Sequence, residues 1–292
     1  MPLFDRYIAV DWSANSRPKG GKDSIWIAER TATEALESVN PRTRHVAMAH
    51  IEKRLELARS SDQRVFVGFD FPFGYPKGTA QRLAGEHDWS QLWATIGLAV
   101  RDHASNQSNR FEVAAGFNRL LGENGPRFWG CPKSAATEFL STHKQGAHFG
   151  DVAEFRIVER AAKGAKSTWQ LFYNGSVGSQ CILGLAHLQG LRGNHPLAAS
   201  IGIWPFETDF ERQLHSPIVF AEIYPSLDDH DKHVEPKDRA QVEAQVRRFA
   251  TLDAAGQFGR ALSLPPEFAA HREVILAEEG WIVGAGHTGL AT

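Results

Sequence analysis

The segment RVFVGFDFPFGYP, residues 64–76, constrains the fold most, because it is almost wholly apolar apart from Asp70. A strand without alternating polar residues is normally covered on both faces, as the central strands of α/β sheets are. Pro72 and Pro76 then end the strand, because proline lacks the N–H that a sheet ladder needs. The sequence therefore predicts an α/β protein with a central strand that ends at Asp70.

Other segments carry weaker but consistent signals of strands and helices. Short apolar runs on either side of a Gly-Gly turn predict an antiparallel hairpin, and apolar residues at intervals of three or four predict helices. The expected strands are residues 6–14, 24–30, 38–46, 201–207 and 217–225, and the expected helices are residues 46–58 and 236–261.

Residues 78–160 differ from the rest of the chain in composition. They are rich in Gly, Asn, Gln, His and aromatic residues, with helical stretches near 89–104 and 111–121 and few strand signals. We expect a single domain over residues 1–292 that carries a largely helical insertion at roughly 78–160, since domains commonly hold 100–200 residues and larger ones hold insertions.

The charge balance and the cysteine count exclude several classes of protein. The 32 basic and 34 acidic residues give a formal charge of -2, without the basic excess typical of proteins that bind phosphate backbones tightly. The two cysteines, Cys131 and Cys181, form no CxxC pair, so neither a disulfide framework nor a structural zinc site is expected. We find no signal peptide and no apolar stretch of 18 residues, and therefore expect a cytoplasmic protein without a membrane partner.

Three acidic residues share an unusual setting inside apolar runs: Asp11 follows Ile-Ala-Val, Asp70 follows Val-Gly-Phe, and Glu222 follows Val-Phe-Ala. Burying a carboxylate without a cation or hydrogen-bond donors is costly, so three such placements point to a common metal ion. Asp253, on the apolar C-terminal helix, is a candidate fourth ligand. Hard oxygen ligands favour Mg²⁺ or Mn²⁺. The alternative is that each acid caps a turn, pairs with an arginine or faces solvent.

A second group of polar residues is a candidate for contacting a phosphate or a base. A glycine-rich loop before a helix presents backbone N–H groups to anions, and the GSVGSQ loop precedes an apolar helix. The alternative is that the glycines of this loop serve a tight turn and that Lys166 is a solvated cation. The candidates are Ser13, Lys166, Gln170, Ser176, Gly178 and Gln180.

Seven short pieces in sequence order carry a resemblance to a known family. The pieces are YIAVDWS, VGFDFPFG, GSVGSQCILG, IWPFE, AEIYPS, FATLDA and EEGWI. With them the chain resembles the bacterial family catalogued as domain of unknown function 429, which is assigned to the ribonuclease H-like superfamily alongside Holliday-junction resolvases. The resemblance runs through most of the chain, while residues 78–160 lie largely outside it.

The resemblance implies a ribonuclease H-like mixed sheet with three antiparallel strands first, flanked by helices. It also implies that Asp11 takes the place of the first-strand aspartate that bridges metals in such nucleases, with Asp70, Glu222 and Asp253 as further ligands. Some members of the family carry labels that relate them to cobalamin or molybdopterin biosynthesis, so the fold leaves the function open.

Three functions remain open on the sequence alone. The first is a Mg²⁺- or Mn²⁺-dependent phosphodiesterase or nuclease, in which four carboxylates hold the metal ions. The second is an enzyme or accessory protein of cofactor biosynthesis that binds a small phosphorylated ligand. The third is a non-catalytic binding protein. An open basic groove would favour nucleic acid, whereas a closed pocket roofed by residues 78–160 would favour a small molecule.

Overall fold

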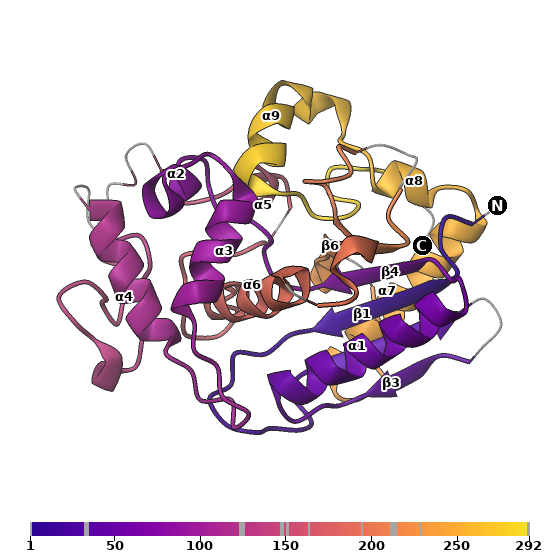
Figure 1. Ribbon diagram of the computed structural model, residues 1–292, viewed down its shortest axis with the longest axis horizontal. Coiled ribbons are helices and arrows are strands. Elements are labelled where there is room, and N and C mark those ends of the chain that lie inside the picture. Colours follow the sequence, from indigo (N-terminus) through magenta and orange to yellow (C-terminus); the bar gives the residue numbers. More distant parts are fainter. Residues whose placement is uncertain are drawn as a thin grey trace.

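A six-stranded mixed sheet forms the centre of the protein in a computed structural model (Figure 1). The strand order is β3-β2-β1-β4-β6-β5; β3, β2 and β1 pair antiparallel, and β1, β4, β6 and β5 pair parallel. The strands are β1 (Arg6–Asp11), β2 (Trp26–Thr31), β3 (Glu37–Val39), β4 (Val65–Phe69), β5 (Ile201–Ile203) and β6 (Ile218–Glu222). The structure describes residues 2–31, 35–122, 126–146, 149, 152–162, 164–193, 195–210, 215–227 and 229–290.

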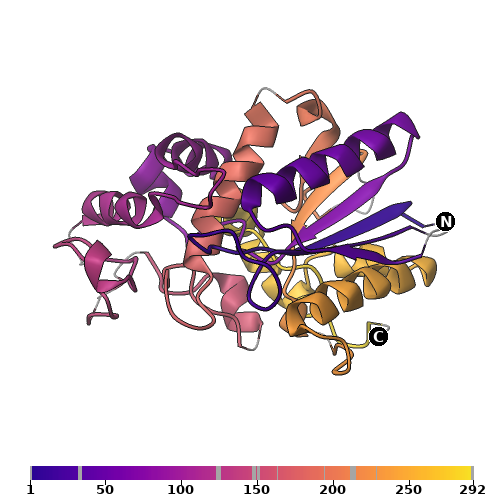
Figure 2. The same cartoon turned by 90° about the horizontal axis from the view of Figure 1, so that it is seen from below.

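Helices cover both faces of the sheet, with α1 and α7 on opposite sides (Figure 2). The helices are α1 (Arg44–Ser60), α2 (Thr79–Ala84), α3 (Trp89–Ala99), α4 (Arg110–Leu121), α5 (Ile157–Ala161), α6 (Gly178–Gly193), α7 (Lys237–Ala254), α8 (Phe258–Ala261) and α9 (Arg272–Val274). Short 3₁₀ turns lie at Lys133–Ala135, Ala198–Ser200, Pro225–Leu227 and Pro266–His271, and a π-helical turn lies at Ile275–Glu279. The protein is therefore an α/β protein with helices on both faces of a mixed sheet.

The central strands bury both of their faces, as their apolar sequences predict. In β1, Ile8 and Val10 belong to the core cluster under α1, whereas Tyr7 and Ala9 belong to the cluster under α7. Successive side chains of a strand point to opposite faces, so this division follows from the strand geometry. A residue of the sheet therefore packs under α1 or under α7 according to its position along the strand.

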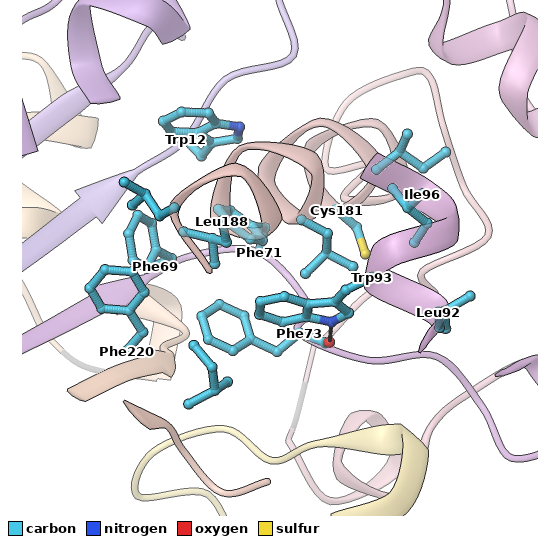
Figure 3. Packing of buried hydrophobic residues seen from close by; sticks show 14 of the residues in the cluster. Trp12, Phe69, Phe71, Phe73, Leu92, Trp93, Ile96, Cys181, Leu188 and Phe220 are labelled. Carbon is cyan, nitrogen blue, oxygen red and sulfur yellow. Dashed lines mark hydrogen bonds between the residues drawn. The ribbon is translucent and has the colours of Figure 1, made fainter. Parts of the chain in front are cut away.

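An aromatic cluster follows β4 and anchors α6 beside it (Figure 3). Phe73 packs edge-on against Trp93 of α3 at 5.5 Å between ring centroids, and the Trp93 indole N–H donates to the Phe73 carbonyl at 2.8 Å. Gly184 of α6 lies directly over the Phe71 ring, where a Cβ atom would clash. The residues just after Asp70 are thus held between α3 and α6.

Several elements match the sequence expectations, and two differ from them. The hairpin, the central strand and the helix expected at 46–58 are all confirmed, and the third strand is shorter than expected, at Glu37–Val39. The helix expected at 236–261 is instead two helices, because Gly256 adopts a positive φ of 68° and its N–H donates to the Asp253 carbonyl at 2.9 Å. The segment 78–160 forms helices, with no strand longer than an isolated bridge among its described residues.

In the described part of the chain, no helix combines the length and the apolar composition that crossing a lipid bilayer requires.

Candidate active site

Asp11 and Asp70 lie side by side where two neighbouring parallel strands end. Val10 of β1 is in register with Phe69 of β4, so each aspartate comes one position after a paired residue. The Asp70 N–H donates to the Val10 carbonyl at 3.1 Å, and the Trp12 N–H donates to Asp70 Oδ1 at 2.7 Å. The two side chains are also hydrogen-bonded to each other. The sequence prediction that these two acids meet is confirmed.

Burial, hydrogen bonds and neighbouring acids dominate the electrostatics of the pair. Burial and then the neighbouring Asp70 raise the pKa of Asp11 well above its usual value. Burial raises the pKa of Asp70 to about 6, although the Trp12 N–H acts in the opposite direction. Asp70 raises the pKa of Asp11, whereas the hydrogen bond with Asp11 lowers the pKa of Asp70, so a proton on the pair is held preferentially by Asp11.

The pair opens into a cavity of about 1100 Å³ at the carboxyl ends of the strands. In α/β sheets this edge is where ligands commonly bind. Its walls carry both signs of charge and several hydroxyl groups. The charged and hydroxyl-bearing residues that line it are Asp11, Ser13, Ser16, Lys19, Asp23, Ser24, Asp70, Arg110, Lys166, Tyr173, Ser176, Ser179, Tyr224, Ser226 and Asp238.

Asp23 and Asp238 are two further acids of the cavity, and they come from other parts of the fold. Asp238 lies in the first turn of α7, and its Oδ2 accepts a hydrogen bond from the Asp23 N–H at 2.6 Å. The negative charge of Asp238 contributes to raising the pKa values of both Asp11 and Asp70. These two acids extend the negative end of the cavity beyond the central pair.

Arg110 supplies the most buried cation of the cavity wall. The residue is 6% exposed, and the hydrogen-bond partners of its guanidinium are hydroxyls: Ser179 Oγ at 3.1 Å, with Ser16 Oγ and Ser108 Oγ each at 3.2 Å. Burial, followed by the charge of Arg44, lowers the pKa of Arg110 to about 10. A buried guanidinium with neutral partners favours the binding of an anion.

Four of the six secondary candidates line the cavity. Ser13, Lys166, Ser176 and Gln180 do so, and the Gln180 side-chain amide donates to the Trp12 carbonyl at 2.5 Å. Lys166 is exposed.

Gln170 and Gly178 have structural roles instead. The Gly178 N–H donates to the Gln170 carbonyl at 2.8 Å, and a Cβ atom at Gly178 would clash with the Thr168 carbonyl oxygen. Neither residue lines the cavity, and the glycine permits close backbone packing where α6 begins, so their contact with a ligand stays a prediction.

Glu222 does not join the aspartate pair, which corrects the expectation that it is a ligand there. Its two carboxylate oxygens accept hydrogen bonds from the Arg156 guanidinium at 2.6 and 2.8 Å, and one also accepts from the Phe73 N–H at 2.9 Å. Glu222 is in register with Phe69, one position before Asp70, and consecutive positions face opposite sides of a sheet. Its carboxylate is therefore buried in an ion pair on the other face.

Asp253 does not join Asp11 and Asp70 as the sequence predicted, because it lies at the opposite end of β1 from them. Its carboxylate accepts hydrogen bonds from the N–H groups of Leu3 and Phe4 at 2.8 and 2.9 Å and from the Tyr7 hydroxyl at 2.5 Å. It lies at the last turn of α7, and Asp238 lies in the first. A rise of 1.5 Å per residue separates the two by about 22 Å. Asp253 therefore anchors the N-terminal segment.

Sequence reasoning missed Asp238 and Arg110. Asp238 is a polar residue in the first turn of a helix, which is common in any protein, and only the direction of α7 relative to β1 brings it to the cavity. Arg110 begins α4, far from the other cavity residues in sequence. Neither has a local signal that distinguishes it from a surface residue.

The aspartate pair fits a hard divalent cation. The pKa values of two adjacent carboxyl groups are raised, no ion pair within the described part of the chain joins either of them to a cation, and oxygen ligands match Mg²⁺ and Mn²⁺. Within the described residues, no third acid lies close enough to complete a compact three-ligand group with them. Magnesium is often held by only one or two carboxylates, with water and substrate phosphate completing its shell.

No protein-family model matches the chain, and neither a curated protein nor a solved structure matches it. Its membership of the family that its seven sequence pieces resemble therefore stays a prediction.

Proposed function

We propose that this protein is a metal-dependent phosphoesterase with a ribonuclease H-like fold, in which Asp11 and Asp70 hold a Mg²⁺ or Mn²⁺ ion. The hydrogen-bonded pair of aspartates in the cavity, which no ion pair among the described residues joins to a cation, is the observation that carries the proposal. Three antiparallel strands followed by parallel ones agree with the ribonuclease H-like order that the resemblance implies.

The cavity offers complementary groups for a phosphoester. Arg110 and Lys166 supply positive charge, and Ser176 and Ser179 supply hydroxyl groups near the start of α6. A cationic, hydroxyl-rich wall would orient the phosphoryl group and stabilise its negative charge. A bound divalent ion would supply Lewis-acid activation of the phosphoryl oxygen and of water. Asp11 and Asp70 would hold that ion in their ionised form.

The dimensions and charge of the cavity favour a small phosphorylated substrate over a long nucleic acid. Its volume of about 1100 Å³ is close to the range of small-molecule sites, roughly 300–1,000 Å³. Of the described residues of the segment 78–160, only Arg110 contributes to its wall, so that segment does not supply the roof expected of a closed small-molecule pocket, and the preference for a small substrate rests on volume and charge. Four acids and three cations line it, and the formal charge of the whole chain is -2. The cavity thus lacks the basic groove that a duplex requires.

The decisive experiment measures metal binding and phosphoester hydrolysis on the same variants. Titration calorimetry of Mn²⁺ and Mg²⁺ would be run on wild type, Asp11→Asn and Asp70→Asn, alongside hydrolysis of p-nitrophenyl phosphate and bis-p-nitrophenyl phosphate. We expect saturable Mn²⁺ binding and hydrolysis by wild type alone.

Glu56→Gln is the matched control, because Glu56 is an exposed acid of α1 outside the cavity. It should behave as wild type. Binding without hydrolysis would favour the non-catalytic alternative, a metal-dependent binding protein. Wild type that neither binds the ions nor hydrolyses either ester would reject the proposal.

A further inference from the structure

Three potential metal ligands meet outside the cavity, from three separate elements. His45 lies in the first turn of α1, Asp102 follows α3, and His187 lies in α6. Among the described residues, these are the three whose ligand atoms all lie within 4.8 Å of one another. None of the three lines the cavity that contains Asp11 and Asp70. The cluster is therefore separate from the candidate active site.

We propose that His45, Asp102 and His187 form a second metal site that binds a divalent transition-metal ion of the Zn²⁺ type. Two imidazole nitrogens and one carboxylate oxygen are a donor set that suits Zn²⁺, with a fourth position left for water. Imidazole nitrogen favours transition metals over Mg²⁺, whereas the all-oxygen pair at Asp11 and Asp70 has the opposite preference. The two sites thus differ in the chemistry of the ion they select.

The separations within the cluster match such a site with small side-chain movements. His187 Nε2 lies 2.9 Å from Asp102 Oδ2, and the His45 and His187 rings are edge to face with 5.2 Å between their centroids. Metal–ligand bonds of about 2.0–2.2 Å place two ligands of a tetrahedral ion roughly 3.3 Å apart. Binding requires the tautomer of His187 with its proton on Nδ1, so that the Nε2 lone pair faces the ion.

Arg44 holds the carboxylate of the cluster in place. Its Nε and one terminal nitrogen donate to the two oxygens of Asp102, both at 2.6 Å, and the Arg44 side chain is fully buried. Ligating carboxylates are commonly hydrogen-bonded by such outer groups, which orient them. The positive charge of Arg44 also disfavours the binding of a metal cation next to it. We therefore expect a weaker site than a structural zinc centre.

The test is calorimetric titration of Zn²⁺ into the untagged full-length protein, with visible absorption of the Co²⁺ form as a second readout. The proteins are wild type, His45→Ala, His187→Ala and Asp11→Asn. His45 is exposed, so its replacement leaves the fold intact, and circular dichroism checks the His187 variant. We expect one Zn²⁺ per wild-type chain and affinity at least about tenfold weaker in both histidine variants.

His50→Ala is the matched control, because His50 lies on the same helix outside the cluster. It and Asp11→Asn should bind Zn²⁺ as wild type does. Absence of saturable binding to wild type, or unchanged affinity in His45→Ala, would overturn the proposal. Loss of Zn²⁺ binding in Asp11→Asn instead would assign the ion to the aspartate pair. Because the readout is Zn²⁺ and not Mg²⁺ or hydrolysis, failure here leaves the proposed function untouched.

Discussion

Asp11 and Asp70 bring two carboxyl groups into contact, and burial raises the pKa of each. A carboxyl with a raised pKa in the folded state stabilises that state below its unfolded pKa of about 3.8, and this contribution disappears as pH rises through the folded pKa. For Asp70 that folded value is about 6. The wild-type protein therefore loses stability between about pH 4 and pH 6 because of Asp70, and the raised pKa of Asp11 adds a loss in the same direction as pH rises.

Asp11→Asn is expected to remove much of this loss, because a neutral amide can donate to the Asp70 carboxylate. The melting temperature of the variant should exceed that of wild type by a few degrees at pH 8 and by less at pH 5, since about 1 kcal/mol shifts it by roughly 2–4 °C in a chain of this order of size. Calorimetric melting at both pH values measures this. A difference that is equal at the two values would contradict the linkage.

Arg110 is the residue on which binding of a phosphate should depend most. Arg110→Met keeps an unbranched stem of similar size and leaves the Ser16 and Ser179 hydroxyls in place, but it removes the guanidinium and its buried charge. Hydrogen bonds to charged groups contribute about 1.5–3 kcal/mol, so we expect affinity for inorganic phosphate to fall roughly 10- to 100-fold. Calorimetry in the presence of Mn²⁺ provides the measurement.

Lys19→Met is the control for Arg110. Lys19 also lines the cavity, but its side chain is 41% exposed and it pairs with Asp23 at 3.5 Å. Its replacement should change phosphate affinity less than about threefold, because an exposed pair contributes little. Equal effects of the two substitutions would show that Arg110 has no special role.

The close approach of helix α6 to the connection between β4 and α2 depends on Gly184. A Cβ atom there would overlap three ring atoms of Phe71, which directly follows Asp70. We expect Gly184→Ala to destabilise the fold by about 1–3 kcal/mol through overpacking, and to weaken Mn²⁺ binding by displacing Asp70. Urea unfolding and Mn²⁺ titration measure the two effects.

Gly190 of the same helix is the matched control. A Cβ atom at Gly190 has no neighbour within 4 Å, so Gly190→Ala should stabilise α6 by about 0.5–1 kcal/mol through its helix propensity alone. If both alanine substitutions stabilise the protein, then the packing of α6 on Phe71 is not tight and the argument for Gly184 is wrong.

Elements with strong local patterns could be predicted from the sequence, whereas their relative placement could not. The apolar runs predicted β1, β2 and β4, and the meeting of Asp11 and Asp70 followed from two parallel strands that end together. Glu222 has the same local pattern, but a register offset of one residue turns it to the other face, and the sequence holds no signal for that offset.

The role of Asp253 depends on long-range direction in the same way. Both Asp238 and Asp253 lie on α7, and only the orientation of the helix across the sheet decides which end reaches the cavity. Single-sequence periodicity gives the buried face of a helix but not its direction. The prediction that the acids meet therefore holds for Asp11 and Asp70, whereas Asp253 on the last helix lies at the other end of β1.

The charge of the whole molecule distinguishes a small phosphorylated substrate from a long nucleic acid. Among the residues that the structure describes, three cations line the cavity, namely Lys19, Arg110 and Lys166, and the chain as a whole carries a formal charge of -2. Binding of single-stranded nucleic acid releases counterions in proportion to the phosphates that are neutralised, with a slope of log affinity against log salt of about -0.7 per phosphate. Three contacts limit that slope to about -2.

We expect affinity for a fluorescently labelled dinucleotide and for a labelled 20-nucleotide strand to differ little, with a salt slope no steeper than about -2 for either. The reason is that the chain carries a formal charge of -2, so phosphates beyond the cavity gain no net attraction from its overall charge. Fluorescence anisotropy across salt concentrations on Asp70→Asn, which is expected neither to hold the metal ion nor to cleave, gives both slopes. A strand that binds far more tightly, with a slope of about -4 or steeper, would require a basic track outside the cavity and would restore long nucleic acid as the substrate.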